Sequence, residues 1–357
     1  MSTSTHEKNK PSAKPLAQAR TSRDRGMTQP VIAVAATGGQ DILRQLPHAL
    51  RAMRPFQWSK NGLVFMALVF AHRLFDFGSD VRVLLAFGVF SLAASSIYII
   101  NDIGDREKDR LHPEKRHRPI ASGALSLPVA YATAGACIAG ALLLMAVLAT
   151  QGVPDPRAFF LAQGGSHALF VATIVGYFGM NLAYTRWLKH LVLWDVFVIA
   201  AGFVLRAVAG ALAIPVPISP WFYLFTTFLA LFQALGKRRA ELMMLEGGSA
   251  SQRRVLAHYN LQLLDQLMGI VVTCALITYS LYTFQGDGVS HKLMITIPFV
   301  MFGMFRYLYL LYVKGDGEQP DEILWHDKQI LAAVTLFLVT IVFLLYGMPV
   351  LQHWAGV

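Results

Sequence analysis

The sequence reads Asn101-Asp102-Ile-Gly-Asp105-Arg-Glu-Lys-Asp109 directly at the end of the apolar segment Val81–Asn101. About 20 apolar residues are what a helix needs to cross a bilayer, so this motif lies where a membrane helix reaches water. Charged groups at such a place are costly and mark a functional face. Spacings of three and four residues place Asp102, Asp105 and Asp109 on one face of a helix. The motif therefore predicts a membrane bundle and the position of its site.

The composition excludes an ordinary soluble enzyme. Of 357 residues, 55% are apolar and 15% are charged, and the mean hydropathy is +0.48, whereas about a quarter of the residues in soluble domains are charged. The net charge is +10, and in a membrane protein an excess of basic residues chiefly indicates which loops face the cytoplasm. No nucleic-acid-binding module is visible, so we expect the lipid bilayer, and not nucleic acid, as the partner.

The hydropathy pattern predicts an all-α, polytopic membrane bundle of nine transmembrane helices, which form a catalytic domain over residues 55–357. Residues 1–40 are polar and predict a disordered cytoplasmic tail. Residues 41–54 place apolar side chains at helical spacing with basic ones opposite, which fits a helix on the anionic leaflet or a solvated linker helix. The predicted spans are Asn61–Phe75, Val81–Asn101, Leu127–Ala149, Ser166–Tyr184, Leu191–Ile214, Pro220–Gly236, Leu263–Phe284, His291–Val313 and Gln329–Val350.

The distribution of Lys and Arg orients the predicted bundle. Alternate loops hold most of these residues, and the remaining loops hold only Arg73, Arg82, Arg157 and Lys292. Because basic loops stay in the cytoplasm, the N-terminus is predicted inside and the C-terminus outside. We therefore expect a multi-pass protein of the cell inner (plasma) membrane with its active site facing the cytoplasm.

The acidic motif predicts a metal site. Three carboxylates on one helical stripe repel each other unless a cation lies between them. Hard oxygen ligands that leave room for water and phosphate suit Mg²⁺ holding a diphosphate, with Mn²⁺ as an alternative. The alternative interpretation is a solvated charged loop. The predicted metal ligands are Asn101, Asp102, Asp105 and Asp109, and the basic residues placed to close over the phosphates are Lys115, Arg116 and Arg118.

The acidic motif after an apolar helix, in a chain with nine predicted spans, resembles the UbiA superfamily of intramembrane prenyltransferases. The resemblance implies two four-helix halves, each with an acidic motif after its second helix, and a ninth closing helix. The second motif should follow Gly236, but the sequence there reads Lys237-Arg238-Arg239-Ala-Glu241. Cationic side chains cannot ligate a metal, but they bind phosphate or carboxylate directly.

The replacement of the second acidic motif by basic residues resembles the polyprenyl-phosphate phosphoribosyltransferase branch of the superfamily. The branch resemblance runs from about Leu46 to the end of the chain. It implies Mg²⁺-dependent transfer of 5-phosphoribose from phosphoribosyl diphosphate to a membrane polyprenyl (decaprenyl-like) phosphate. A homo-oligomer is an expectation that only the resemblance implies. The matching segments are Arg54-Pro55-x-Gln57-Trp58-x-Lys60-Asn61, Arg116-x-Arg118-Pro119-Ile-Ala-Ser122-Gly123, Tyr184 with Leu188-Lys189, Gly202-Phe-Val-Leu-Arg206-Ala-Val-Ala-Gly210, Gly236-Lys237-Arg238-x-Ala-Glu241, and Gly317-Glu318-x-Pro320-Asp-Glu322 with Asp327.

The remaining site residues are predicted from charge and resemblance together. No general base is required, because a phosphate monoester is already anionic at neutral pH. Arg206 shares a helical face with Asp195, eleven residues earlier, so its partner is either a protein carboxylate or a substrate. Tyr184 fits an interfacial tyrosine as well as a site residue. The predicted catalytic residues are Asp102, Asp105, Asp109, Lys237 and Arg238, and the predicted substrate-binding residues are Lys60, Asn61, Asn101, Lys115, Arg116, Arg118, Tyr184, Lys189, Arg206 and Glu241.

Two other functions compete with phosphoribosyl transfer. The first is ordinary prenyl transfer from a prenyl diphosphate to an aromatic acceptor, with the second metal site rebuilt from Glu241 and Glu246. The second is a transporter that passes a phosphorylated solute between acidic and basic clusters. Transporters often contain repeated apolar segments that Gly or Pro interrupts at the midplane, and this sequence gives no strong support for such a repeat.

Overall fold

The structure is a computed structural model that describes residues 37–113, 115–151, 166–214, 216, 219–246, 254–284, 290–315, 323 and 326–355. The regular structure in these ranges is entirely helical, as predicted. The longer helices are α1 (Thr37–Met53), α3 (Phe77–Gly104), α5 (Leu127–Thr150), α6 (Ser166–Arg186), α7 (Trp194–Ala213), α8 (Pro220–Glu246), α9 (Leu261–Phe284), α10 (Ile297–Tyr309) and α12 (Lys328–Val342). The shorter ones are η1 (Pro55–Phe65), α2 (Met66–Phe70), α4 (Arg106–Leu111), η2 (Lys115–His117), η4 (Leu188–His190), η5 (Arg254–His258), η6 (Ser290–Thr296), η7 (Leu310–Lys314), η8 (Phe343–Gly347) and α13 (Met348–Ala355).

Among the described residues, seven helices are long and apolar enough to cross a membrane, and they correspond to seven of the nine predicted spans. The predicted first span is divided into the 3-10 helix η1 and the short α2, so neither reaches the necessary length. The predicted sixth span lies in α8, where Trp, Tyr, Thr and basic residues lower the hydropathy of a sufficiently long helix. Nine crossings therefore stay a prediction.

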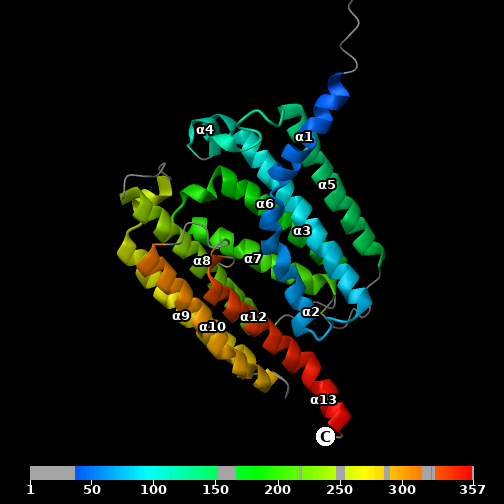
Figure 1. Cartoon of the computed structure of the whole chain (residues 1–357), viewed down its shortest axis with the longest axis vertical. Helices are drawn as coiled ribbons and strands as arrows, with labels where there is room; N and C mark the ends of the chain where they lie inside the picture. The colour runs from blue at the N-terminus through cyan, green and yellow to red at the C-terminus, as the bar shows by residue number, and fades with distance from the viewer. Residues whose placement is uncertain are drawn as a thin grey trace, which may run out of the picture. The chain divides into compact units, whose positions relative to one another are not determined.

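Helix α7 is the central element of the compact unit Arg44–Val357. It packs against α6 and α8 and also contacts α3 and η1, while α3 lies beside α5, α8 beside α9 and α10 beside α12 (Figure 1). Small residues on α7 allow this close packing. A side chain at Gly210 would place its Cβ 2.1 Å from the carbonyl oxygen of Val64. Glycine at this position therefore lets η1 lie directly against α7.

Helix α1 begins at Thr37, earlier than the predicted start at residue 41. Ala49 and Ala52 are buried in a core shared with α3 and the start of α5, whereas Leu46 and Leu50 are exposed on the surface. Apolar side chains of α1 therefore lie both in the core and on the surface, and the contact of this helix with a leaflet stays a prediction. Residues 1–36, most of the predicted tail, lie outside the described residues.

The last helix is fastened to the end of the first predicted span. Tyr346, in the π-helical turn η8, donates from its hydroxyl to the carbonyl oxygen of Leu68 at 3.0 Å and accepts from the N–H of Leu74 at 3.1 Å. These bonds satisfy backbone groups where α2 ends. The C-terminal helical segment is thereby hydrogen-bonded to the segment around α2, near the N-terminal side of the bundle.

Candidate active site

The acidic motif spans the junction between α3 and α4. Helix α3 ends at Gly104, and Asp105 separates it from α4. The N–H groups of Asp105 and Asp109 each still donate to the carbonyl four residues earlier at 2.8 Å, so the helical path continues. Asp102 and Asp109 are 4% and 5% exposed, whereas the Asp105 side chain is 37% exposed. Two of the three predicted carboxylates are thus buried, and the third is accessible.

Two arginines neutralise the buried carboxylates. Nη1 of Arg118 donates to Asp102 Oδ1 at 3.0 Å and to Asp109 Oδ2 at 2.7 Å. Nη2 of Arg54 donates to both oxygens of Asp102 at 2.7 and 2.9 Å. Sequence analysis predicted Arg118 as a site residue but gave Arg54 no role, although Arg54 begins one of the matching segments.

The donor set of the acidic motif suits a divalent cation chemically, since it consists of hard oxygens. One positive group, Arg118 Nη1, already lies between Asp102 and Asp109, while Asp105 lies 4.0 Å from Lys108. Within the described residues, no three His, Cys, Asp or Glu side chains are arranged to hold a metal ion. Because Arg118 takes the position between the buried carboxylates, it would have to move for a metal to enter there.

The segment η1 carries Arg54 to the acidic motif. Arg54 precedes η1 with a left-handed backbone, φ 55°. Trp58 Nε1 donates to Ser95 Oγ at 3.1 Å, and Asn61 Nδ2 donates to Ser91 Oγ at 3.1 Å. Because Ser91 and Ser95 are one helical turn apart, η1 is fixed along α3. Lys60, also predicted, is half-buried between these anchors.

The basic turn after α4 divides into exposed and inward-facing parts. Lys115 and Arg116 are exposed in η2, and Arg116 Nε donates to His117 Nε2 at 3.3 Å. Arg118, next along the chain, points to the buried carboxylates. In this turn Lys115 and Arg116 therefore lie at the surface, and Arg118 binds the acidic motif.

Arg238 has protein carboxylates as partners. Its side chain is 1% exposed and forms ion pairs with Asp195, at 3.3 Å from Nε to Oδ2, and with Glu241. The hydroxyl of Tyr259 donates to Asp195 Oδ1 at 2.7 Å and accepts from the N–H of Leu193 at 2.8 Å. Burial and the bond to Asp195 raise the pKa of Tyr259, so its hydroxyl stays protonated and donates. Sequence analysis missed Tyr259, since nothing local identifies it as a partner.

The neighbouring Arg239 has an analogous arrangement on the other side of α8. Its Nε donates to Asp265 Oδ1 at 2.7 Å, and Tyr312 donates to the same carboxylate oxygen at 2.8 Å. The guanidinium lies 4.0 Å from the centre of the Tyr312 ring. Adjacent arginines thus each have an aspartate and a tyrosine: Arg238 has Asp195 of α7 with Tyr259, and Arg239 has Asp265 of α9 with Tyr312 of η7. The Tyr307 side chain of α10 lies against Gly236, where a Cβ would be 2.7 Å from the Tyr307 hydroxyl.

The acidic and basic clusters lie at the same end of the bundle. Thr185, in the last turn of α6, donates from Oγ1 to Asn101 Oδ1 at 3.1 Å. The short turn η4 then leads to α7, where Asp195 pairs with Arg238 near the end of α8. The predicted residues Tyr184, Lys189 and Lys237 are half-buried at this end. The two clusters therefore lie at one end of the bundle, whereas Arg206 and Asn61 form a group of their own (Figure 1).

Arg206 and Asn61 form a separate buried group deeper in the bundle. Arg206 Nε donates to Asn61 Oδ1 at 2.6 Å, Nη1 to the Gly202 carbonyl at 2.7 Å and Nη2 to the Tyr177 hydroxyl at 2.8 Å. The hydrogen-bond acceptors found for Arg206 within the described residues are neutral oxygens. Asp195, on the same helical face, pairs with Arg238 instead.

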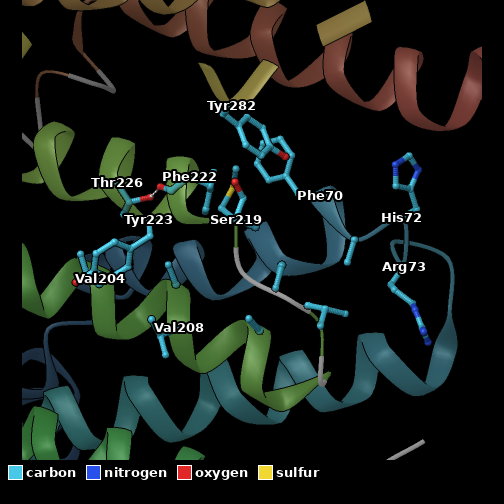
Figure 2. Close-up of a pocket in the computed structure, with 16 residues that line it drawn as sticks. Phe70, His72, Arg73, Val204, Val208, Ser219, Phe222, Tyr223, Thr226 and Tyr282 are labelled. Carbon is cyan, nitrogen blue, oxygen red and sulfur yellow. Dashed lines mark hydrogen bonds between the residues drawn. The ribbon is translucent and has the colours of Figure 1, made fainter. Parts of the chain in front are cut away.

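A mainly apolar cavity of about 400 Å³ lies between α2, α7 and α8. Figure 2 shows Phe70, Val204, Val208, Phe222 and Tyr282 among its walls, with basic side chains on the turn after α2. The cavity is lined by Met66, Ala67, Phe70, Ala71, His72, Arg73, Val204, Ala207, Val208, Ala211, Val216, Ser219, Phe222, Tyr223, Thr226 and Tyr282. Its volume and lining are typical of a site for an apolar ligand.

Long apolar helices with buried ion pairs at one end of the bundle define an integral membrane protein with a charged site. The chain belongs to the UbiA prenyltransferase family, which it matches over residues 62–324. The predicted superfamily resemblance is confirmed.

Curated relatives carry a more specific name. The chain is 36% identical to a decaprenyl-phosphate phosphoribosyltransferase of Corynebacterium glutamicum over 311 residues, 84% of this chain and 87% of the relative. It is 33% identical to the protein of the same name from Mycobacterium tuberculosis, over 81% of this chain and 93% of the relative. The structure of a UbiA homologue from Archaeoglobus fulgidus bound to DMAPP and Mg²⁺ shares the fold, with a TM-score of 0.60, 18% identity and coverage of 83% of this chain and 98% of that one.

Proposed function

We propose that this protein transfers 5-phosphoribose from phosphoribosyl diphosphate to a membrane polyprenyl phosphate, of the decaprenyl type, and releases diphosphate. The observation that carries the proposal is the asymmetry of the two clusters. One half has an acidic motif with two buried carboxylates, and the equivalent position of the other half has Lys237, Arg238 and Arg239. The names of relatives that are 33% and 36% identical over most of the chain support the same reaction.

The reaction is a displacement at the anomeric carbon of the donor. An oxygen of the lipid phosphate forms a bond to C1 of the ribose, and the bond from C1 to the diphosphate oxygen breaks with its electron pair leaving on the diphosphate. Positive charge spreads over the ribose ring in the transition state, while negative charge grows on the leaving group. No proton has to be removed from the acceptor, because the phosphate monoester is anionic.

A divalent cation would be held by Asp102, Asp105 and Asp109 with Asn101, and when bound it neutralises charge on the leaving diphosphate. Magnesium suits these oxygen ligands, and a UbiA homologue of this fold has been solved with Mg²⁺. The chain's own cations complete the site: Arg54 and Arg118 bind the carboxylates, and we assign Lys60, Lys115 and Arg116 to the donor phosphates. Lys237 and Lys189 are placed to attract the lipid phosphate or the 5-phosphate.

The location of the site follows the distribution of charge. We place the N-terminus and the charged end of the bundle in the cytoplasm, the C-terminus outside and nine crossings of the plasma membrane, in accordance with the positive-inside rule. The apolar cavity around Val204 and Val208 lies further along α7 than Asp195, so it is suited to the isoprenoid chain of a lipid whose phosphate lies at the charged end.

The test is a transfer assay with purified protein in detergent. The protein is incubated with Mg²⁺ and either phosphoribosyl diphosphate plus decaprenyl phosphate, or a prenyl diphosphate plus an aromatic acid. Diphosphate release and a phosphoribosylated lipid with the first pair alone support the proposal. Product with the second pair alone would replace it by prenyl transfer, and product with neither would leave both enzymatic readings wrong.

A further inference from the structure

The turn between α6 and α7 is hydrogen-bonded to the rest of the bundle at both of its ends. At its start, Thr185 donates from Oγ1 to Asn101 Oδ1 of the acidic motif at 3.1 Å. At its end, the N–H of Leu193 donates to the Tyr259 hydroxyl at 2.8 Å. Lys189, in η4, lies four residues from each of these anchors. The position of Lys189 therefore depends on both hydrogen bonds.

The end of this turn has a backbone conformation that needs support from outside the turn. Leu193 has φ 67° and ψ −39°, whereas residues with a Cβ rarely adopt a positive φ. Its carbonyl accepts from the N–H of Phe197 at 2.9 Å as α7 begins, its N–H is bound to Tyr259, and its side chain is exposed. Strained residues persist where surrounding contacts hold them, and they are frequent at functional sites. The strain at Leu193 therefore directs attention to the contact with Tyr259.

Tyr259 is itself held by a buried ion pair. Its hydroxyl donates to Asp195 Oδ1 at 2.7 Å, and Asp195 pairs with Arg238 at 3.3 Å. Tyr259 is buried, and it belongs to the core that joins α7, α8 and α9. One hydroxyl thus bridges the backbone of Leu193 and the side chain of Asp195. We call Tyr259, Asp195 and Arg238 the buried clamp, because together they hold the end of the turn.

Lys189 is the charged site residue whose position the buried clamp controls. It is half-buried, and no ion pair of its ammonium group is found in the part of the chain that the structure describes. Such a cation is suited to bind a phosphate. We propose that Tyr259 is a positioning residue for phosphate binding: through Leu193 it holds η4 so that Lys189 presents its ammonium group to a substrate phosphate. This inference rests on the proposed function, which supplies the phosphate.

The experiment measures kcat and both KM values of transfer for the full-length protein in detergent at saturating Mg²⁺. Lys189→Ala should raise the KM of phosphoribosyl diphosphate or of decaprenyl phosphate about tenfold, and it thereby identifies the phosphate that Lys189 binds. Tyr259→Phe keeps the packed ring but loses the hydroxyl, so the KM of the same substrate should rise about three- to tenfold at nearly unchanged kcat. The double variant should be no worse than Lys189→Ala, because residues that act through one another are not additive.

Glycine at position 193 provides an independent rescue. It adopts a positive φ without steric cost, so Leu193→Gly should bring the KM of Tyr259→Phe part of the way back to the wild-type value. Leu191→Gly is the control in the same turn, since Leu191 is also exposed but has an ordinary φ of −96°, and it should not rescue. Tyr312→Phe removes a hydroxyl that donates to Asp265, the partner of Arg239, and it should leave both KM values unchanged.

Thermal unfolding of each variant in detergent separates positioning from stability, and kinetics are measured below each melting temperature. A Tyr259→Phe protein with a lower melting temperature but wild-type KM values would overturn the inference while transfer itself persists. Additive effects of Tyr259→Phe and Lys189→Ala, or equal recovery by Leu191→Gly and Leu193→Gly, would overturn it as well. Absence of transfer from phosphoribosyl diphosphate by the wild type would overturn the proposed function and this inference with it.

Discussion

Nη2 of Arg54 lies 2.7 and 2.9 Å from the two carboxylate oxygens of Asp102, a residue 48 positions further along the chain. The contact joins the start of η1 to the end of α3. Together with Arg118 it balances the charge of the buried carboxylates Asp102 and Asp109. Under the proposed function, a divalent cation held here would neutralise the carboxylates, and the diphosphate of the donor would accept hydrogen bonds from the arginines. The same ion pairs can therefore be exchanged for ligand contacts without leaving a charge unpaired.

Arg54→Ala should impair transfer although Arg54 lies outside the acidic motif. Its loss leaves Asp102 with one guanidinium and removes a cation from the donor phosphates. A charge-assisted hydrogen bond contributes about 1.5–3 kcal/mol, so kcat/KM for phosphoribosyl diphosphate should fall about ten- to hundredfold. Arg54→Lys should recover part of the activity, because a single ammonium replaces the planar fork. Arg51→Ala, an exposed arginine one turn earlier on α1, is the control, and equal activity in all variants would contradict the role.

Activity should require Mg²⁺ or Mn²⁺ and be lost in EDTA. Asp102→Ala, Asp105→Ala and Asp109→Ala should each abolish turnover, since each removes a metal ligand and leaves the diphosphate charge uncompensated. The loss should appear chiefly in the use of the donor. The matched control is Glu107→Ala, on the same α4 segment, whose side chain is 74% exposed. Normal turnover in EDTA would show that the carboxylates form ion pairs with Arg54 and Arg118 but do not bind a catalytic metal.

Lys237 and Arg238 should respond differently to removal. Lys237→Ala should raise the KM of one phosphate substrate about tenfold with a smaller fall in melting temperature than Arg238→Ala, because it removes a half-buried and not a fully buried cation. Arg238→Ala should lower the melting temperature, since it deprives the fully buried Asp195 of its cation at a cost of about 3–5 kcal/mol. Thermal unfolding and steady-state kinetics on both variants separate the two roles. Identical effects of the two substitutions would be inconsistent with the structure.

The sequence allowed the acidic motif, the basic replacement and most spans to be predicted, because each depends on neighbouring residues. Arg54 and Tyr259 could not be found in this way, since their partners lie 48 and 64 positions away. Asp195 and Arg206 share one face of α7, as their spacing predicts, but they do not pair with each other. Asp195 pairs with Arg238, and Arg206 donates to Asn61. The first span was expected to be one helix, whereas Gly210 admits a 3-10 segment against α7.

The pair Arg306 and Asp327 should make stability depend on acid pH. The Arg306 guanidinium, 2.8 Å away, holds the pKa of Asp327 below its usual value, and the N–H groups of the first turn of α12 add to the effect. A lowered pKa in the folded state stabilises the protein above the unfolded-state pKa of about 3.9, and this contribution is lost as pH falls through the folded value. The melting temperature of Asp327→Asn should therefore fall less between pH 6 and pH 3 than that of the wild type. Parallel pH profiles would argue against the pair as a source of acid sensitivity.

Ala207→Trp should impair use of the lipid acceptor without changing use of the donor. Ala207 lines the apolar cavity of about 400 Å³, so an indole there would fill space that we assign to the isoprenoid chain. The KM for decaprenyl phosphate should rise about tenfold, the equivalent of 1.4 kcal/mol, while the KM for phosphoribosyl diphosphate stays constant. For a short-chain acceptor whose isoprenoid does not extend into the cavity, the KM of the variant should equal that of the wild type. Ala136→Trp, at an exposed position of α5, controls for the effect of a new indole in the bundle. An equal rise in KM for long and short acceptors would mean that the substitution distorts α7, and no rise for either would place the isoprenoid chain elsewhere.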